Sequence, residues 1–349
     1  MIDRKPFSSL AWNVSENEYR ADSALSYSTL AKYEREGFEH LDTLFDKVES
    51  PSLLLGSCVD TLLTDGEEAF NDAYYVSDIP SMEPKVEPVV KEVYRQFKDS
   101  YTSITDIPDS KMLPIIEAFK YQPNWRPDTR CRVIREKGYK YYTTMFMAKD
   151  KTILTQNTYN KAFACVRALK DSEATSKYFA KNDPFSNIER YYQLKFKGTL
   201  NGIEYRCMAD VIAIDHDRKV VYPCDLKTSS HMEYDFPKSF IQWNYAIQAR
   251  LYWRLIRQAM DKDEIYKDYT LADYTFIVVN TIGTPNPLTW QFSHTKDKGT
   301  ITLGNNKLRD PEDIGEELHY YLNAKPIIPN GILPNQPNSI ETWFEEHEQ

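Results

Sequence analysis

The chain of 349 residues lacks the features that mark several special classes of protein. No stretch approaches the roughly 20 uncharged apolar residues that a membrane-spanning helix requires, and the N-terminal residues carry acids early and have no apolar signal-peptide core. The five cysteines are scattered without a CxxC spacing, which argues against a zinc site and indicates reduced thiols. No Gly-x-x-x-x-Gly-Lys-Ser/Thr loop is present, so we expect no bound nucleotide. These absences favour a cytoplasmic protein without membrane association.

Charge is distributed unevenly along the chain. The formal net charge is −9, yet residues 161–206 contain nine Lys and Arg against five Asp and Glu. From Asp310 onward the only Lys or Arg is Lys325, which stands against nine acidic residues. Binding of a polyanion depends on where the positive charge lies, so the basic middle of the chain matters more for such a partner than the net charge does.

Hydrophobic periodicity predicts helices on both sides of a strand-rich middle. A hydroxyl N-cap at Ser26 predicts a short helix, and the apolar run Leu53–Leu63 predicts a buried one. Seven prolines divide residues 78–138 into short helices at about 89–99 and 111–120. Further helices are expected at 155–180 with a break near Asp171, at 239–260 and at 311–322, followed by an extended tail after Pro326.

The strongest strand signal lies in residues 189–227. Alternating residues around an Asn201-Gly202 turn predict a three-stranded meander. Its strands are expected at Tyr191–Phe196, Glu204–Ile214 and Val220–Tyr222, and two more strands at Tyr274–Asn280 and Leu288–Phe292. The length allows two domains or one large α/β domain with insertions.

Two acids and a lysine come together near the end of this meander. Asp210 lies on one strand and Asp225 on the next, so the hairpin brings both carboxylates to one end of the sheet. Asp225 and Lys227 are two residues apart and therefore lie on one face, where a carboxylate can ligate a hard cation and an ammonium can stabilise negative charge or orient a water. Pro223 indicates a bulge or strand end just before them. A cross-strand salt bridge would explain the same pattern.

Other polar residues are candidates for the same site. Gln248 and Tyr252 share one face of a helix, where an amide and a phenol could contact a phosphate, a base or the lysine, although a helix surface or the edge of the core is the plain alternative. Asp60 interrupts an apolar helix and needs a cation, a base or hydrogen bonds nearby, and a helix cap or a buried salt bridge would also explain it. Glu189 begins the meander upstream of Asp210, and aromatic residues nearby offer stacking surfaces or simply core.

Short segments of the chain occur in a familiar order. They are Ala24–Leu30, Gly56–Leu63, Glu68-Ala69-Phe70, Glu189, Ala209-Asp210, Asp225-Leu226-Lys227-Thr228-Ser229 and Gln248–Tyr252. In this order they resemble the PD-(D/E)xK nuclease superfamily, and within it the exonuclease VIII type and the RecB-like branch of phage recombination modules. The resemblance covers about residues 24–280, and the DLKTS and QxxxY pair is its most specific part. The chain departs from the family at Asp60, where a histidine is usual.

The resemblance implies a restriction-endonuclease-like α/β core with a central mixed β-sheet flanked by helices and with a helical insertion. It also implies bound Mg²⁺, for which Mn²⁺ can substitute, and oxygen ligands suit both ions. The ligands implied or considered are Asp210, Asp225, the backbone carbonyl of Leu226, Asp60 in place of the histidine, and Glu189.

The remaining roles also follow from the resemblance. Lys227 would position or activate the attacking water, and Gln248 and Tyr252 would support the site. A bound divalent metal beside a lysine can activate water and neutralise charge during phosphodiester hydrolysis without a nucleophilic side chain. The related iron–sulfur branch keeps cysteines after the Gln248–Tyr252 helix, but none follows Cys224 here, so we expect no cluster.

The implied organisation and activity are those of a Mg²⁺-dependent deoxyribonuclease. The expected divisions are a flexible lead-in at 1–25, the N-terminal part of the nuclease domain at 26–77, a proline-rich helical insertion at 78–138, the catalytic core at 139–300, and an acidic helix and tail at 301–349. The enzyme would degrade linear double-stranded DNA as an exonuclease, 5′ to 3′, in phage-type recombination in a bacterial or phage-infected host cytosol. A single-strand annealing protein and further copies of the chain are expected partners.

Three lysines of the basic middle are candidate DNA contacts: Lys177, Lys181 and Lys195. Two other hypotheses stay open. The first is a catalytically inactive DNA-binding or regulatory protein on the same fold, with Asp60 as the sign of lost activity. The second is a structure-specific endonuclease or nickase, because the motifs determine the chemistry and not the dependence on DNA ends.

Overall fold

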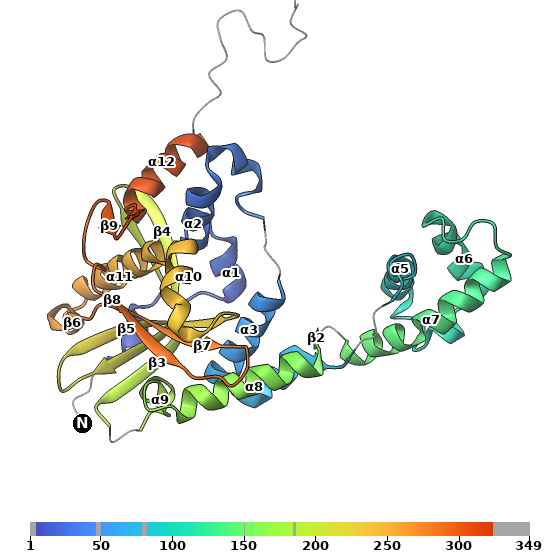
Figure 1. The fold of residues 1–349 in the computed structure, drawn as a ribbon, viewed down its shortest axis with the longest axis horizontal. Coiled ribbons are helices and arrows are strands. Elements are labelled where there is room, and N and C mark those ends of the chain that lie inside the picture. The colour runs from blue at the N-terminus through green and yellow to red at the C-terminus, as the bar shows by residue number, and fades with distance from the viewer. Residues whose placement is uncertain (1–4, 47–49, 79–81, 150, 184–185, 324–349) are drawn as a thin grey trace, which may run out of the picture.

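The computed structural model describes residues 5–46, 50–78, 82–149, 151–183 and 186–323 of the chain. Most of them form a body built on one large sheet, and a helical arm projects from the body to one side (Figure 1). The strands are β1 (Tyr74–Val76), β2 (Thr152–Leu154), β3 (Ile188–Leu200), β4 (Ile203–Asp215), β5 (Val220–Ser229), β6 (Thr270–Leu271), β7 (Tyr274–Asn280), β8 (Leu288–Phe292), β9 (Ile301–Leu303) and β10 (Asn306–Leu308). The helices are α1 (Glu16–Ala21), α2 (Tyr27–Glu36), α3 (Pro51–Thr64), α4 (Gly66–Ala73), α5 (Glu87–Phe97), α6 (Asp109–Ala118), α7 (Pro127–Ala148), α8 (Gln156–Asp171), α9 (Ser176–Phe179), α10 (Phe236–Gln242), α11 (Tyr245–Asp261) and α12 (Pro311–Asn323).

The central sheet has the strand order β3-β4-β5-β7-β8, with β6 paired to β5 off this path. The meander β3-β4-β5 is antiparallel, β5 and β7 are parallel, and β7 and β8 are antiparallel. A parallel pair needs a long crossover, and α10 and α11 supply it between β5 and β7. The predicted α/β fold with a central mixed β-sheet flanked by helices is therefore confirmed.

Helices cover both faces of this sheet. Side chains of α11 pack on one face in one hydrophobic cluster, and side chains of α3 and α8 pack on the other face in a second cluster. Every residue of β7 is buried, as expected for a strand whose two faces are both covered. Asp225 and Lys227 lie on the α11 face of β5, because Cys224, which precedes them, and Leu226, which separates them, belong to the α3 and α8 cluster.

The expected loose lead-in is wrong for the described residues 5–25. Phe7 is fully buried, and its ring packs edge-on against Tyr266 at a centroid distance of 4.9 Å. Helix α1 begins with a capping box, in which Ser15 and Glu18 each bond the backbone of the other. That Ser-x-x-Glu spacing is visible in the sequence and predicts a helix start.

The single helix expected at 239–260 is also wrong, because it is broken between α10 and α11. Asn244 adopts a left-handed conformation at φ 55°, which asparagine tolerates better than most residues. The hydroxyl of Tyr27 donates to the Trp243 carbonyl at 2.7 Å and satisfies a backbone group next to the break. The break expected near Asp171, in contrast, is confirmed, since α8 ends at that residue.

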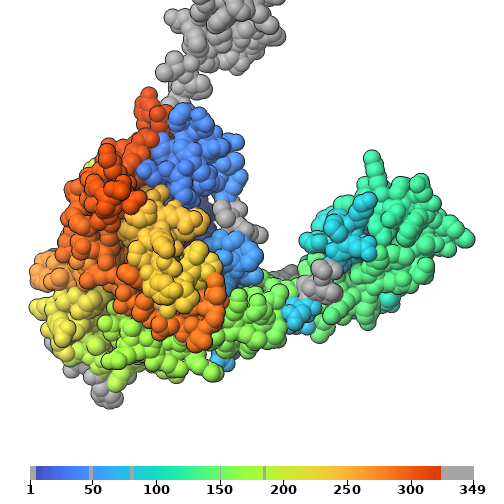
Figure 2. Space-filling model, in the orientation of Figure 1, coloured from blue at the N-terminus to red at the C-terminus, as the bar shows by residue number. Residues whose placement is uncertain are grey.

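The projecting arm has a hydrophobic core of its own, formed by α5, α6 and α7. Figure 2 shows that one end of the arm is joined to the body and that in this view the rest of the arm does not touch it. Helices α5 and α6 match the expected pair, but the 22-residue α7 was not anticipated, and the expected boundary at residue 138 falls inside it. Gly138, which disfavours a helix by itself, lies where a Cβ would come within 2.7 Å of Val90 Cγ2. Packing against α5 therefore explains why α7 forms although local helix propensity at Gly138 is unfavourable.

The C-terminal elements return to the body. The acidic helix expected at 311–322 is α12, which packs against α2 and α11. The extended tail expected after Pro326 lies outside the described residues. Among the described residues, no helix has both the length and the apolar composition to cross a membrane.

Candidate active site

The centre of the site is a fork between β4 and β5. The two strands pair from Asp215↔Val220 to Val211↔Cys224 and then separate, while β5 continues beside β7 as far as Ser229↔Asn280. Asp210 is the first residue of β4 beyond the last pair. Its Oδ2 accepts a hydrogen bond from the backbone N–H of Leu226 at 3.0 Å, which ties the two strands together across the opening.

An irregularity in β3 also shapes this point. Gln193 has φ 52°, and the β3–β4 ladder steps from Tyr192↔Val211 to Leu194↔Ala209 without a Gln193–Asp210 pair. Gln193 Nε2 lies 3.4 Å from Asp210 Oδ1. The amide therefore holds the second oxygen of the carboxylate, a role that the sequence reasoning missed. The only signal was a polar residue in the middle of a strand.

Asp225 is the most enclosed group of the site, with 1% of its surface exposed. Lys227 Nζ lies 2.6 Å from Asp225 Oδ2, and Gln248 Nε2 on α11 donates to Asp225 Oδ1. The two carboxylate oxygens are thus held by a charge on one side and an amide on the other, which offsets the cost of burying the anion. The structure brings together three of the predicted site residues here.

Aromatic rings surround the ammonium group of Lys227. Nζ lies 4.6 Å from the ring centre of Tyr245 at the start of α11 and 6.0 Å from that of Tyr27 on α2. Burial lowers the pKa of Lys227, but the Asp225 carboxylate and the two phenols outweigh it and raise the pKa above its ordinary value. Lys227 is therefore an ammonium ion in a fixed position. Tyr245 was predicted to lie near the site as a stacking surface or as core, and Tyr27 was not predicted to contact the lysine.

Asp60 approaches the fork from α3, on the opposite face of the sheet. Gly56, one turn earlier, allows this approach, because a Cβ there would lie 3.3 Å from Thr228 Oγ1 on β5. Burial, and then the Asp225 charge, raise the pKa of Asp60 to about 7, while Lys227 opposes the shift. Burial and the charges of Asp225 and Asp60 likewise raise the pKa of Asp210 well above its ordinary value. Asp60, Asp210 and Asp225 thus influence one another electrostatically around the fork, with Lys227 as the opposing charge.

This donor set fits a hard divalent cation in chemistry and charge. Carboxylate and carbonyl oxygens are the ligands that Mg²⁺ prefers, and the mutual repulsion of the acids favours a cation near them. Within the part of the chain that the structure describes, however, no three His, Cys, Asp or Glu side chains converge as an ion site. Asp60 is therefore not a third converging ligand here, and the ligands that fit the cation are Asp210, Asp225 and the Leu226 carbonyl, with Asp60 near enough to add its charge.

Tyr252 lies one turn after Gln248 on α11, as predicted. Its side chain is buried, and its ring packs edge-on against Tyr274 at 6.1 Å. Burial raises the pKa of Tyr252 well above its ordinary value, and Asp225 and Asp210 add to the shift, so the phenol is neutral and close to both acids. Tyr252 therefore borders the site as a buried, neutral phenol.

Glu189 does not belong to the site. Its register partner on β4 is Ile214, four residues from Asp210, which corresponds to about 13 Å along a strand. Glu189 Oε2 instead accepts from the Tyr191 hydroxyl at 2.7 Å and lies 3.4 Å from Nε2 of the buried His216. Gln193, and not Glu189, is the β3 residue beside Asp210.

The three candidate DNA-contacting lysines differ in their surroundings. Lys195 Nζ donates to the carbonyl of Val14 at 2.8 Å and so anchors the N-terminal segment. Lys177 and Lys181 are exposed, and Lys177 Nζ lies 5.0 Å from the ring centre of Tyr178. Of the three lysines, only Lys177 and Lys181 therefore present their charge to solvent.

Fold and site together define an α/β protein with a carboxylate, lysine and amide cluster at a strand fork. No protein-family model matches the chain, and no curated protein matches it either. Among solved structures, it is similar to a protein of Eubacterium rectale named as a candidate exonuclease, with 13% identity and a TM-score of 0.45 over 95% of this chain and 98% of the other.

Proposed function

We propose that this protein is a metal-dependent deoxyribonuclease that degrades linear double-stranded DNA from its ends, in the 5′ to 3′ direction. The observation that carries the proposal is the cluster at the fork. Asp210 and Asp225 project from diverging strands, and Lys227 Nζ lies 2.6 Å from the second carboxylate. Acids that can hold a metal, beside a positioned ammonium, can supply the activated water and the charge neutralisation that hydrolysis of a phosphodiester needs.

The residues have distinct tasks in this proposal. Asp210, Asp225 and the Leu226 carbonyl would hold Mg²⁺ or Mn²⁺, which when bound supplies charge neutralisation and lowers the pKa of a water. Lys227 holds a positive charge where negative charge develops on the phosphate oxygens and orients the attacking water.

Other side chains keep these groups in place. Gln248 holds Asp225 Oδ1, and the rings of Tyr27 and Tyr245 confine the lysine. Groups that are held in advance need no reorganisation during the reaction.

An acidic chain can still bind DNA through a local surface. We propose that exposed lysines such as Lys177 and Lys181 contact the phosphates, since they lie in the basic middle of the sequence. A role in phage-type recombination beside a single-strand annealing protein would follow from an end-dependent activity of this kind.

Digestion of end-labelled linear duplex and covalently closed circular DNA tests the activity. Wild type, Lys227→Ala and Lys267→Ala are compared with Mg²⁺, Mn²⁺ or EDTA, and labels at either end report the polarity. Lys267 is a matched control, because it is an exposed lysine that is also paired with an acid, Glu264, on the surface. We expect metal-dependent loss of the linear DNA alone, abolished by Lys227→Ala and retained by Lys267→Ala.

The other outcomes select the alternative functions. Cleavage or nicking of the closed circle would indicate an endonuclease or nickase at the same site. Binding of DNA by wild type without any metal-dependent product would indicate an inactive DNA-binding protein. Equal activity of Lys227→Ala and wild type would refute the assignment of the site.

A further inference from the structure

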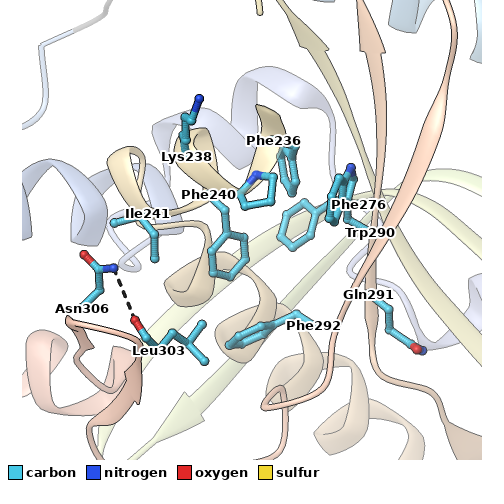
Figure 3. A pocket seen from close by; sticks show the side chains of 11 residues that line it. Phe236, Lys238, Phe240, Ile241, Phe276, Trp290, Gln291, Phe292, Leu303 and Asn306 are labelled. Atoms are coloured by element: carbon cyan, nitrogen blue, oxygen red, sulfur yellow. Dashed lines mark hydrogen bonds between the residues drawn. The ribbon is translucent and has the colours of Figure 1, made fainter. Parts of the chain in front are cut away.

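An aromatic pocket lies on the same face of the sheet as the candidate active site. It has a volume of about 590 Å³, within the range of ligand pockets, and lies between α10, β7, β8 and the β9–β10 hairpin. Figure 3 shows aromatic side chains grouped around it. These are Phe236 and Phe240 from α10, Phe276 from β7, and Trp290 and Phe292 from β8.

The pocket is connected to the site by direct neighbours. Phe276 is the register partner of Asp225 across the β5–β7 pair, so the two backbones lie side by side. The Tyr245 ring, 4.6 Å from Lys227 Nζ, is stacked on Phe236 with 5.7 Å between centroids and an interplanar angle of 14°. Together these two distances keep the pocket wall at Phe236 within about 10 Å of the Lys227 ammonium.

The chemistry of the pocket favours a flat aromatic ligand. Its walls are rings, which bind nucleobases of any sequence by stacking. A polar group stands at its margin: the Asn306 amide, whose Nδ2 donates to the Leu303 carbonyl, can meet the edge of a base with its oxygen (Figure 3). An apolar side chain of a protein partner would suit the walls equally, but so close to Lys227 it would compete with the DNA for space.

We propose that this pocket binds an unpaired nucleobase of the substrate strand near the phosphate that is cleaved. The proposal rests on the proposed nuclease function and specifies how the enzyme holds an opened DNA end. At about 3.4 Å per nucleotide along one strand, a separation of about 10 Å places this base within about three nucleotides of the phosphate at Lys227.

The test places a single abasic site, or a single 2-aminopurine, at each of the six positions nearest the end of a linear duplex. Binding is measured with Ca²⁺ in place of Mg²⁺, so that the DNA remains intact. We expect one position, or two adjacent ones, where 2-aminopurine fluorescence is quenched and where the abasic site weakens binding about 5- to 150-fold, the range that stacking of one base provides.

Two variants identify the pocket as the source of this effect. Trp290→Leu removes a ring, and Ile241→Trp fills the space without removing any packing. Trp125→Leu is the control, because that tryptophan is 42% exposed and lies between α6 and α7 of the arm, outside the residues that line the pocket. Both pocket variants should lose the sensitivity to the abasic position, while the control keeps it, and equal urea midpoints verify that all three are folded.

Two results would overturn the inference. One is a position-dependent effect that persists in both pocket variants, which would place the base elsewhere. The other is a wild type that cleaves unmodified DNA but whose binding is equally insensitive to an abasic site at all six positions. That result would leave a protein side chain as the occupant of the pocket. Failure of the nuclease proposal is seen separately, as wild type that cleaves no unmodified DNA.

Discussion

Replacement of Asp310 by alanine should destabilise the body strongly, because this carboxylate forms ion pairs with two buried arginines of α11. Asp310 Oδ2 lies 2.7 Å from Arg250 Nη2, and its Oδ1 lies 2.6 Å from Arg254 Nη1. The backbone N–H groups of Gly299 and Glu312 donate to it at 2.7 and 2.9 Å. Arg250 has no exposed surface, so water cannot replace the lost partner.

The expected loss follows from this enclosure. Removal of one partner from a buried ion pair costs about 3–5 kcal/mol, because the other charge stays buried without compensation. At an m-value of about 3 kcal/mol/M, the urea midpoint of the body should fall by about 1–2 M. Asp42→Ala, an exposed aspartate of the same type, is the control and should leave the midpoint unchanged.

The same residue predicts a dependence on pH. Burial raises the pKa of Asp310. The hydrogen bonds from Arg254 and from the Glu312 N–H, together with the charges of Arg254 and Arg250, outweigh burial and lower the pKa below its ordinary value. A lowered pKa in the folded state adds stability above the unfolded-state pKa of about 3.9, and this contribution is lost as the pH falls through the folded value. The difference in urea midpoint between wild type and Asp310→Ala should therefore have its full value near pH 7 and become smaller below about pH 4. A midpoint shift below about 0.3 M at pH 7 would refute the reasoning.

Three further predictions concern the site, the arm and the DNA surface. Gln248→Ala removes a hydrogen bond to the buried carboxylate of β5 and should lower the rate of DNA cleavage about 10- to 100-fold with little change in DNA affinity, as a comparison of kcat and KM would reveal. Gly138→Ala places a Cβ 2.7 Å from Val90 Cγ2 and should destabilise the arm by about 1–3 kcal/mol, seen as faster proteolysis of α5–α7, whereas an unchanged cleavage pattern would contradict the packing. Charge reversal of Lys177 and Lys181 to Glu should weaken DNA binding and reduce the slope of log K against log salt by about 2, and an unaltered slope would exclude these lysines as phosphate contacts.

Much of the sheet was predictable from the sequence because its pattern is local. Alternation around the Asn201-Gly202 turn marks β3 and β4, and the unbroken apolar run Tyr274–Asn280 marks a strand buried on both faces. The arm helix α7 was not predictable, because Gly138 is unfavourable in a helix and only its contact with Val90 explains it. The break at Asn244 likewise depends on a distant residue, Tyr27, whose hydroxyl satisfies the carbonyl beside it.

The candidate site divides in the same way. The sequence by itself determined that Asp225 and Lys227 share a face, since they are two residues apart on a strand, and that Gln248 and Tyr252 share a face, since they are one turn apart on a helix. Only the tertiary structure decided which neighbours meet them. Gln193 replaces Glu189 beside Asp210, because strand register lies in the pairing of two segments and not in either one.

The surroundings of Lys227 and the arginines of α11 were decided in the same manner. Tyr27 comes from an N-terminal helix, yet its ring lies beside Lys227 of β5. Asp310 precedes the last described helix, yet its carboxylate pairs with Arg250 of α11. Periodicity describes which residues face inward along one element, and burial then selects partners from elements that are far apart in the chain. The sequence therefore determined which groups are present in the site, and the packing of distant elements determined their partners, their charge and their position.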